Sequence, residues 1–136
     1  MSGSENTIFA LSTPNGKSAV ALIRISGKKS YKLIKKISTS YGAQSIVASI
    51  DLKKDNSKYA VYINNGEKKL NINPKDYIKK ILKMDIGEVL LRSIDKDGSG
   101  TGLDYDLIDL MPKNQSKNLI LTGGCGNIKH IEEGLL

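Results

Sequence analysis

The feature that most constrains this chain is a short apolar run that opens into an acidic, glycine-rich loop. Residues 89–94 read Val-Leu-Leu-Arg-Ser-Ile, and residues 95–102 read Asp-Lys-Asp-Gly-Ser-Gly-Thr-Gly. A run of this length between turn residues predicts a buried strand. The loop that follows it predicts a site at the carboxyl end of that strand.

The same pattern of an apolar run followed by a polar loop occurs twice more. Residues 45–50 lead to Asp51, and residues 118–121 lead to the Thr-Gly-Gly-Cys-Gly turn at 122–126. The segments between the three runs are lysine-rich and helix-like, and they are long enough to cross between parallel strands. The chain is therefore expected to be α/β, with its chemistry at the carboxyl ends of the strands.

Turn and capping signals divide the central segment further. Residues 59–63 and 67–70 flank Asn64-Asn65-Gly66, which predicts a small hairpin inserted between a strand and the next helix. Asn73-Pro74 marks a helix start, so residues 74–84 are expected to be helical.

The first part of the chain has a different character. Residues 6–12 and 18–25 are strand candidates around the turn Thr13-Pro14-Asn15-Gly16, and residues 30–37 have helical spacing. This segment, over about residues 1–38, resembles the N-terminus of the tRNA-uridine-modifying GTPases of the TrmE (MnmE) family. The resemblance implies a folate-binding tRNA-modification module. No P-loop motif of such a GTPase occurs in the sequence.

From about residue 41 the chain resembles another family. Three motifs, at residues 42–54, 87–98 and 122–130, occur in the order found in the C-terminal half of the cyclase subunit of imidazole glycerol phosphate synthase. The resemblance implies a partial (β/α)8 barrel of about three βα units, whose strands are the fifth to seventh of the full barrel. The chain is thus expected to be a mosaic of two domains, residues 1–40 and 41–136.

The cyclase resemblance also implies roles for six residues. Asp51 would be the catalytic acid/base carboxylate, and the substrate phosphate would be bound by Asp97, Gly98, Thr122, Gly123 and Gly124. The reaction would be ammonia-dependent ring closure and C–N cleavage on a phosphorylated ribosyl substrate, in histidine biosynthesis. A glutaminase subunit is a further expected partner, and neither a cofactor nor a metal is expected.

Two alternatives concern the central strand and its loop. The family has a small polar residue where this chain has Arg92. The guanidinium of Arg92 would either bind phosphate or fill the space left by missing neighbouring residues. The loop at 95–106 also carries oxygen side chains at the spacing of a calcium-binding EF-hand, although its twelfth residue is Asp106 rather than glutamate.

Length and composition limit what the chain can do by itself. A full barrel of this type needs about 250 residues, and this chain has 136, with no aspartate among the first 50 to complete an acid/base pair. We therefore expect weak or no activity in isolation. The alternative is a non-catalytic phosphate-binding or structural half-barrel, as in a fusion or engineered fragment. Either the first two strands cover the open half-barrel or the chain self-associates.

The remaining composition argues against several partners. Only two of the 21 basic residues are arginines, which indicates a solvated lysine surface rather than a nucleic-acid interface. No apolar run approaches a membrane span. The single cysteine suits a reducing compartment, so the protein is expected to be cytoplasmic.

Overall fold

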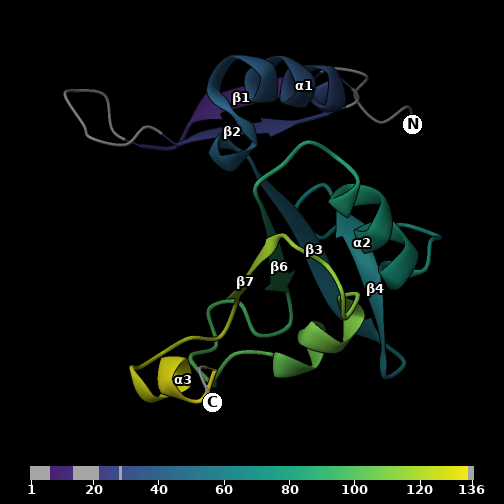
Figure 1. Cartoon of the computed structure of the whole chain (residues 1–136). Helices are drawn as coiled ribbons and strands as arrows, with labels where there is room; N and C mark the ends of the chain where they lie inside the picture. The colour runs from purple at the N-terminus through teal and green to yellow at the C-terminus, as the bar shows by residue number, and fades with distance from the viewer. Residues whose placement is uncertain (1–6, 14–21, 28, 135–136) are drawn as a thin grey trace.

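A five-stranded mixed sheet forms the centre of the molecule (Figure 1). The structure is a computed structural model and describes residues 7–13, 22–27 and 29–134. The strand order is β5-β4-β3-β6-β7, in which β3, β6 and β7 are parallel and β4 and β5 are antiparallel to their neighbours. The strands are β3 (Val47–Asp55), β4 (Lys58–Ile63), β5 (Lys68–Lys69), β6 (Glu88–Ser93) and β7 (Asn118–Thr122). The predicted α/β class and the three parallel strands are confirmed.

The N-terminal segment forms a separate antiparallel pair, β1 (Ile8–Leu11) and β2 (Ile23–Ser26), followed by α1 (Ser30–Tyr41). Residues 14–21, which include most of the predicted turn, lie outside the described residues. In Figure 1 this pair lies beside α1, at the end of the sheet where the parallel strands begin. Every residue of β1 is exposed, so this strand does not bury itself against the half-barrel.

The strand β3 is longer than the sequence indicates, because the inserted hairpin pairs with it. The predicted strand ended at residue 50. In the structure, β4 pairs antiparallel with β3 from Asp51 to Asp55, and this pairing extends the strand to Asp55. Asp51 therefore lies in the middle of a strand. The predicted hairpin itself is confirmed by β4 and β5, which pair through Ile63 and Lys68.

The helix after the hairpin, α2 (Pro74–Leu82), begins where the sequence predicts and ends two residues earlier. Its start is fixed by Asn73, whose side-chain oxygen accepts a hydrogen bond of 2.9 Å from the backbone N–H of Lys75. Proline at the first helical position needs no acceptor for its nitrogen, so both residues favour a helix that starts here.

The connection between β6 and β7 differs from the expected helical crossover. Within the described residues it contains a 3₁₀ helix, η2 (Tyr105–Leu110), and no α-helix. The glycine-rich loop takes up the first part of the connection, and Pro112 follows the short helix, which leaves little chain for an α-helix. The two other short helices are η1 (Ala43–Ser45) and α3 (Lys129–Glu132).

The hydrophobic core lies on one face of the sheet only. Leu52, Val89 and Leu91 are fully buried there, and Ile78 of α2 and Leu107 of η2 belong to the same cluster. The opposite face, which carries the side chains of alternate strand residues, is covered less completely. Among the described residues, no helix is long and apolar enough to cross a membrane.

Candidate functional site

The candidate site lies on the less covered face of the sheet, where three polar residues form a row. Asp51 of β3, Arg92 of β6 and Thr122 of β7 are paired in register across the parallel strands. Paired residues of neighbouring strands point to the same face, so these three side chains share one surface. All three are half-buried.

Arg92 connects the predicted acid/base residue to the predicted phosphate loop. Its Nη2 donates a hydrogen bond of 2.9 Å to Asp51 Oδ2, and its Nη1 lies 3.8 Å from Asp97 Oδ2. The second distance is an ion pair but too long for a hydrogen bond. The structure therefore brings Asp51 and Asp97 to the same guanidinium.

The loop after β6 places Asp97 and Gly98 near the strand end. The backbone N–H of Asp97 donates to Ser93 O at 3.1 Å, which folds the loop back toward β6. Gly98 has a φ of 74°, and a Cβ placed on it would have no atom within 4 Å. Its backbone is thus open to solvent on the side where a side chain would stand.

The loop after β7 is held tightly against the loop after β6. A Cβ on Gly123 would stand 2.5 Å from Ser93 O, and one on Gly124 would overlap the carbonyl of Gly102. The backbone N–H of Gly102 donates to Gly124 O at 2.8 Å, so the two loops are directly bonded. Only glycine allows this approach at the observed φ values of 97° and 95°.

These loops leave backbone donors without acceptors. Within the described residues, the N–H groups of Gly98, Gly123 and Gly124 donate to no backbone or side-chain acceptor. Unpaired N–H groups of glycine-rich turns are the donors that hold phosphate oxygens in many proteins. Four of the five predicted phosphate residues lie in two adjacent loops, and Thr122 ends β7 in the same row as Asp51. The roles of all six residues stay predictions.

A second network, which the sequence did not predict, supports the loop after β6. The buried carboxylate of Asp104 accepts hydrogen bonds from the Tyr59 hydroxyl at 2.7 Å and from Ser93 Oγ at 3.0 Å. Burial, followed by the bond to Asp104, raises the pKa of Tyr59 to about 12, so the phenol stays a donor at neutral pH. No local pattern could have identified Tyr59, because its partner lies 45 residues away.

Lys54 adds to this network from β3. Its Nζ lies 3.1 Å from Asp106 Oδ2 and 5.1 Å from the centroid of the Tyr59 ring, and its backbone N–H donates to Asp95 Oδ2 at 2.7 Å. The hydrogen bond to Asp106 is the main cause that raises the pKa of Lys54 well above its usual value. The loop after β6 is therefore joined both to β4, through Tyr59, and to β3, through Lys54.

The EF-hand alternative for this loop is wrong in its geometry. The oxygen side chains at the EF-hand positions each bond to a different group rather than converging; they include those of Asp95, Asp97, Ser99 and Asp106. The described residues contain no cluster of three carboxylate, histidine or cysteine side chains that could hold a metal ion.

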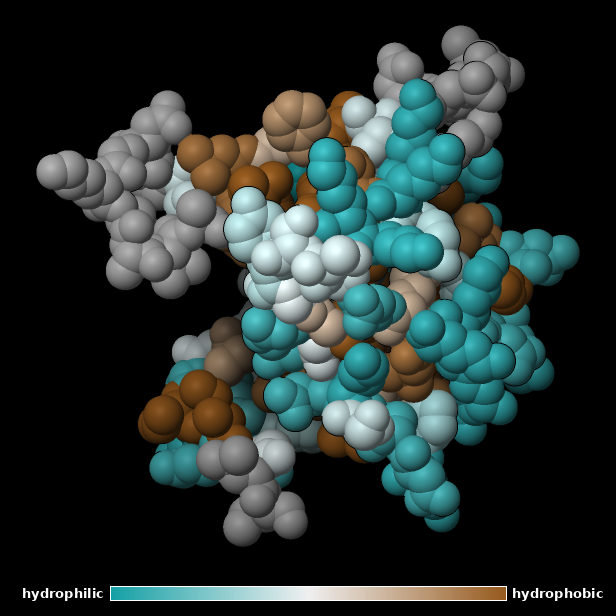
Figure 2. Space-filling view, turned by 45° about the horizontal axis from the view of Figure 1, so that its top comes forward, coloured by the Kyte–Doolittle hydropathy of each residue, from teal (hydrophilic) through white to brown (hydrophobic). Residues whose placement is uncertain are grey.

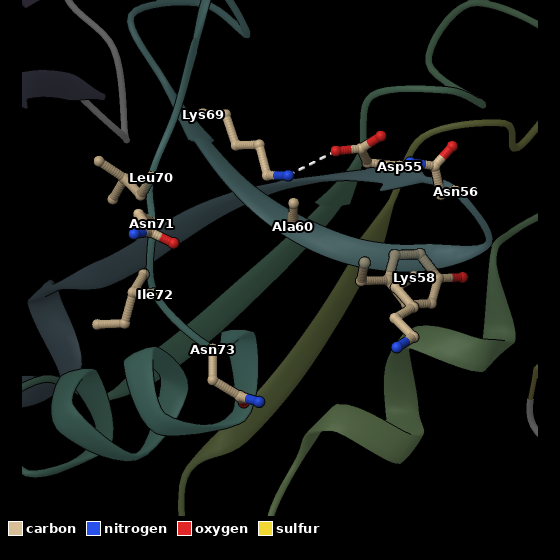
Figure 3. Close-up of a pocket in the computed structure, with 10 residues that line it drawn as sticks. Asp55, Asn56, Lys58, Ala60, Lys69, Leu70, Asn71, Ile72 and Asn73 are labelled. Atoms are coloured by element: carbon tan, nitrogen blue, oxygen red, sulfur yellow. Dashed lines mark hydrogen bonds and ion pairs between the residues drawn. The ribbon is translucent and has the colours of Figure 1, made fainter.

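A hollow of about 570 Å³ lies elsewhere, beside β4, β5 and the loop that leads to α2 (Figure 3). Lys69 and Asp55 form an ion pair of 2.5 Å across it, and none of the six predicted site residues lines it. This hollow is thus separate from the candidate site on the sheet face.

Comparisons with known proteins show the family of this chain. Residues 20–135 match the family model described as histidine biosynthesis protein. The chain is 43% identical over 101 residues to the putative imidazole glycerol phosphate synthase subunit hisF2 of Parasynechococcus marenigrum, covering 74% of this chain and 38% of that protein. It is 37% identical over 116 residues to the imidazole glycerol phosphate synthase subunit HisF of Leptospira biflexa, covering 84% and 46%. The HisF subunit of Prosthecochloris aestuarii is 32% identical over 103 residues, covering 76% and 41%.

The chain spans less than half the length of these curated relatives. Three parallel strands on a mixed sheet are consistent with part of a (β/α)8 barrel, although the comparisons do not fix the number of βα units. None of them tests the TrmE-like N-terminus or a domain boundary near residue 40, which stay predictions.

Proposed function

Because this chain belongs to the histidine biosynthesis protein family, we propose that it supplies one part of the active site of an imidazole glycerol phosphate synthase cyclase. The observation that carries the proposal is the row of Asp51, Arg92 and Thr122, with the two glycine loops at the end of the row. The substrate is a phosphorylated ribosyl compound, the reaction is ring closure with C–N cleavage, and a glutaminase subunit supplies the ammonia.

Asp51 transfers the proton in this mechanism. Arg92 holds the Oδ2 atom of the carboxylate, and Oδ1 has no hydrogen-bond partner among the described residues. One oxygen is thereby fixed while the other faces the open side, which is the arrangement a general acid/base requires. A second aspartate for the acid/base pair would come from outside residues 1–50, because these contain none.

The glycine loops bind the phosphate group of the substrate. The free N–H groups of Gly98, Gly123 and Gly124 donate to its oxygens, and the Thr122 hydroxyl lies on the same face of the sheet. Backbone donors that are already oriented bind an anion without losing side-chain entropy. Fixing the phosphate brings the reacting part of the substrate over the row that contains Asp51.

A titration with ribose 5-phosphate, followed by amide NMR, tests the proposal. Saturable shifts are expected at residues 97–98 and 122–124, with ribose as the control for the sugar alone. Asp51→Asn is expected to keep the phosphate-induced shifts. Its effect on chemistry is measured by ammonia-dependent turnover after addition of a complementary barrel half.

A well-folded sample that shows no amide shifts at residues 97–98 or 122–124 would contradict the cyclase proposal. Saturable binding without turnover in the reconstituted protein would instead favour the non-catalytic alternative, a phosphate-binding half-barrel. The incomplete set of carboxylates in this chain is the observation that keeps this second candidate in place.

A further inference from the structure

We propose that Arg92 binds the phosphate group of the ligand directly. This inference rests on the proposed function and adds a residue to it. Its starting point is that both terminal nitrogens of Arg92 point to carboxylates of the candidate site, Asp51 and Asp97. Binding of phosphate by the glycine loops does not by itself imply a role for Arg92.

The guanidinium can be reached from solvent although its stem is held in the sheet. The side chain of Arg92 is 29% exposed, while its Nε atom is buried and has no hydrogen-bond partner. Its Nη1 lies 3.8 Å from Asp97, which precedes Gly98, so the guanidinium lies beside the glycine-rich loop after β6. A phosphate bound at Gly98 would lie within reach of the arginine side chain.

The two carboxylates are not equivalent partners of Arg92. The contact with Asp51 is a charge-assisted hydrogen bond of 2.9 Å, whereas Nη1 and Asp97 are 3.8 Å apart and Asp97 is 56% exposed. Nη1 therefore has bonding capacity left. A phosphate oxygen at hydrogen-bond distance would interact with it more strongly than Asp97 does, because charge-assisted bonds weaken with distance.

The charges of the site also require a cation. A phosphate would approach two carboxylates, Asp51 and Asp97, and the unpaired N–H groups carry only partial charges. Arg92 is the cation that lies between the two carboxylates. Arginine suits this position because its planar fork can donate to a carboxylate and a phosphate at the same time.

The sequence makes the experiment unusually direct, because the chain has only two arginines. A side-chain NMR spectrum of the arginine Nε–H groups therefore contains one signal from Arg92 and one from Arg24. Arg24 lies on β2, in the separate two-stranded sheet, and serves as an internal control (Figure 1). Titration with ribose 5-phosphate is expected to shift the Arg92 signal with the same saturation curve as the amides of Gly98 and Gly124, and to leave Arg24 in place.

Three variants separate direct binding from charge compensation. Arg92→Met is expected to weaken ribose 5-phosphate binding about tenfold or more, and Arg92→Lys less, because lysine keeps the charge but not the fork. The double variant Asp51→Asn/Arg92→Met has the net charge of the wild type and leaves no unpaired carboxylate on β3. It is expected to bind as weakly as Arg92→Met.

Each result decides the matter. The affinity for ribose 5-phosphate is obtained from the amide shifts. If Arg92→Lys and the double variant both keep the wild-type affinity, the role of Arg92 is overturned and the proposed function stays intact. Wild-type affinity in the double variant alone would show that Arg92 only neutralises Asp51, which also overturns direct binding. Absence of amide shifts in the wild type would overturn both proposals. If Arg92→Met does not fold, the test rests on Arg92→Lys and the double variant. Well-dispersed amide spectra of these two variants show that they are folded.

Discussion

Gly98 and Gly123 have similar backbone conformations but different surroundings. Both have positive φ values, 74° and 97°, which cost an alanine about 1 kcal/mol. A Cβ has free space at Gly98, whereas at Gly123 it would stand 2.5 Å from Ser93 O. We expect Gly98→Ala to lower the free energy of unfolding by about 1 kcal/mol and Gly123→Ala by about 3 kcal/mol, because only the second adds overpacking.

Urea unfolding of the two variants and the wild type measures this difference. Gly98→Ala is the matched control, since it makes the same substitution in the same backbone region. Equal losses in both variants would mean that the approach of the β7 loop to Ser93 relaxes freely.

Tyr59 makes stability depend on alkaline pH. Burial and the bond to Asp104 raise its pKa to about 12 from the usual 10, so the folded protein holds this proton more tightly than the unfolded chain does. Its contribution is complete below pH 10 and is lost as the pH rises from about 10 to 12. Tyr59→Phe, which cannot titrate, is expected to show a smaller alkaline loss and a lower stability at neutral pH, by about 2 kcal/mol.

Urea unfolding of wild type and Tyr59→Phe between pH 8 and about pH 11.5 tests this expectation. Lys54 and Asp104 face the phenol and are present in both proteins. Parallel pH curves for the two proteins would show that the phenol is not held in the way the Asp104 bond implies.

At the scale of elements, the start of α2 depends on a single local bond. Asn73 accepts from the backbone N–H of Lys75 at 2.9 Å and precedes proline at the first helical position. Asn73→Ala is expected to cost about 1 kcal/mol, the usual effect of losing such a cap. Asn71→Ala, in the exposed loop two residues earlier, is the control and should change the urea midpoint little. Similar losses in both would argue against a capping role.

Elements set by local patterns could be predicted, and those set by distant pairing could not. The apolar runs predicted β6 and β7 closely, and Asn73-Pro74 predicted the start of α2. The pairing of β4 with β3 was missed, because nothing within residues 51–55 indicates that a later strand will extend them. The prediction of a helix between β6 and β7 was wrong for a similar reason. Gly102 packs against Gly124 of a distant loop, and this contact holds the first part of the connection as a loop.

The candidate site shows the same limit. Its six residues could be chosen from motifs, and the structure places them on one row and two adjoining loops. The bonds of Asp104 to Tyr59 and Ser93 join segments that are far apart in sequence, so only the fold reveals them. Asp104 is a carboxylate in a glycine-rich loop, and the sequence indicated no role for it.

At the scale of the whole molecule, the parallel sheet has unpaired backbone on both sides. β4 pairs with β3 only from Asp51 onward, and within the described residues nothing pairs with the preceding residues of β3 on that side or with the outer side of β7. Apolar side chains are exposed on the N-terminal strand pair as well, including Phe9 at 78%, and brown surface is visible in the upper part of Figure 2. Unpaired strand edges of this kind favour association with other chains.

We therefore expect the chain to self-associate through the edge of β3. Val47 lies in the unpaired part of this strand and is 45% exposed, so a lysine there would place a charge in the proposed interface. Val47→Lys is expected to weaken association about tenfold or more in sedimentation velocity. Ile108→Lys is the matched control, because Ile108 of η2 is also 45% exposed but lies away from this edge. A wild type that stays monomeric at NMR concentrations, or equal effects of both lysines, would show that the open edge of β3 is not used for association.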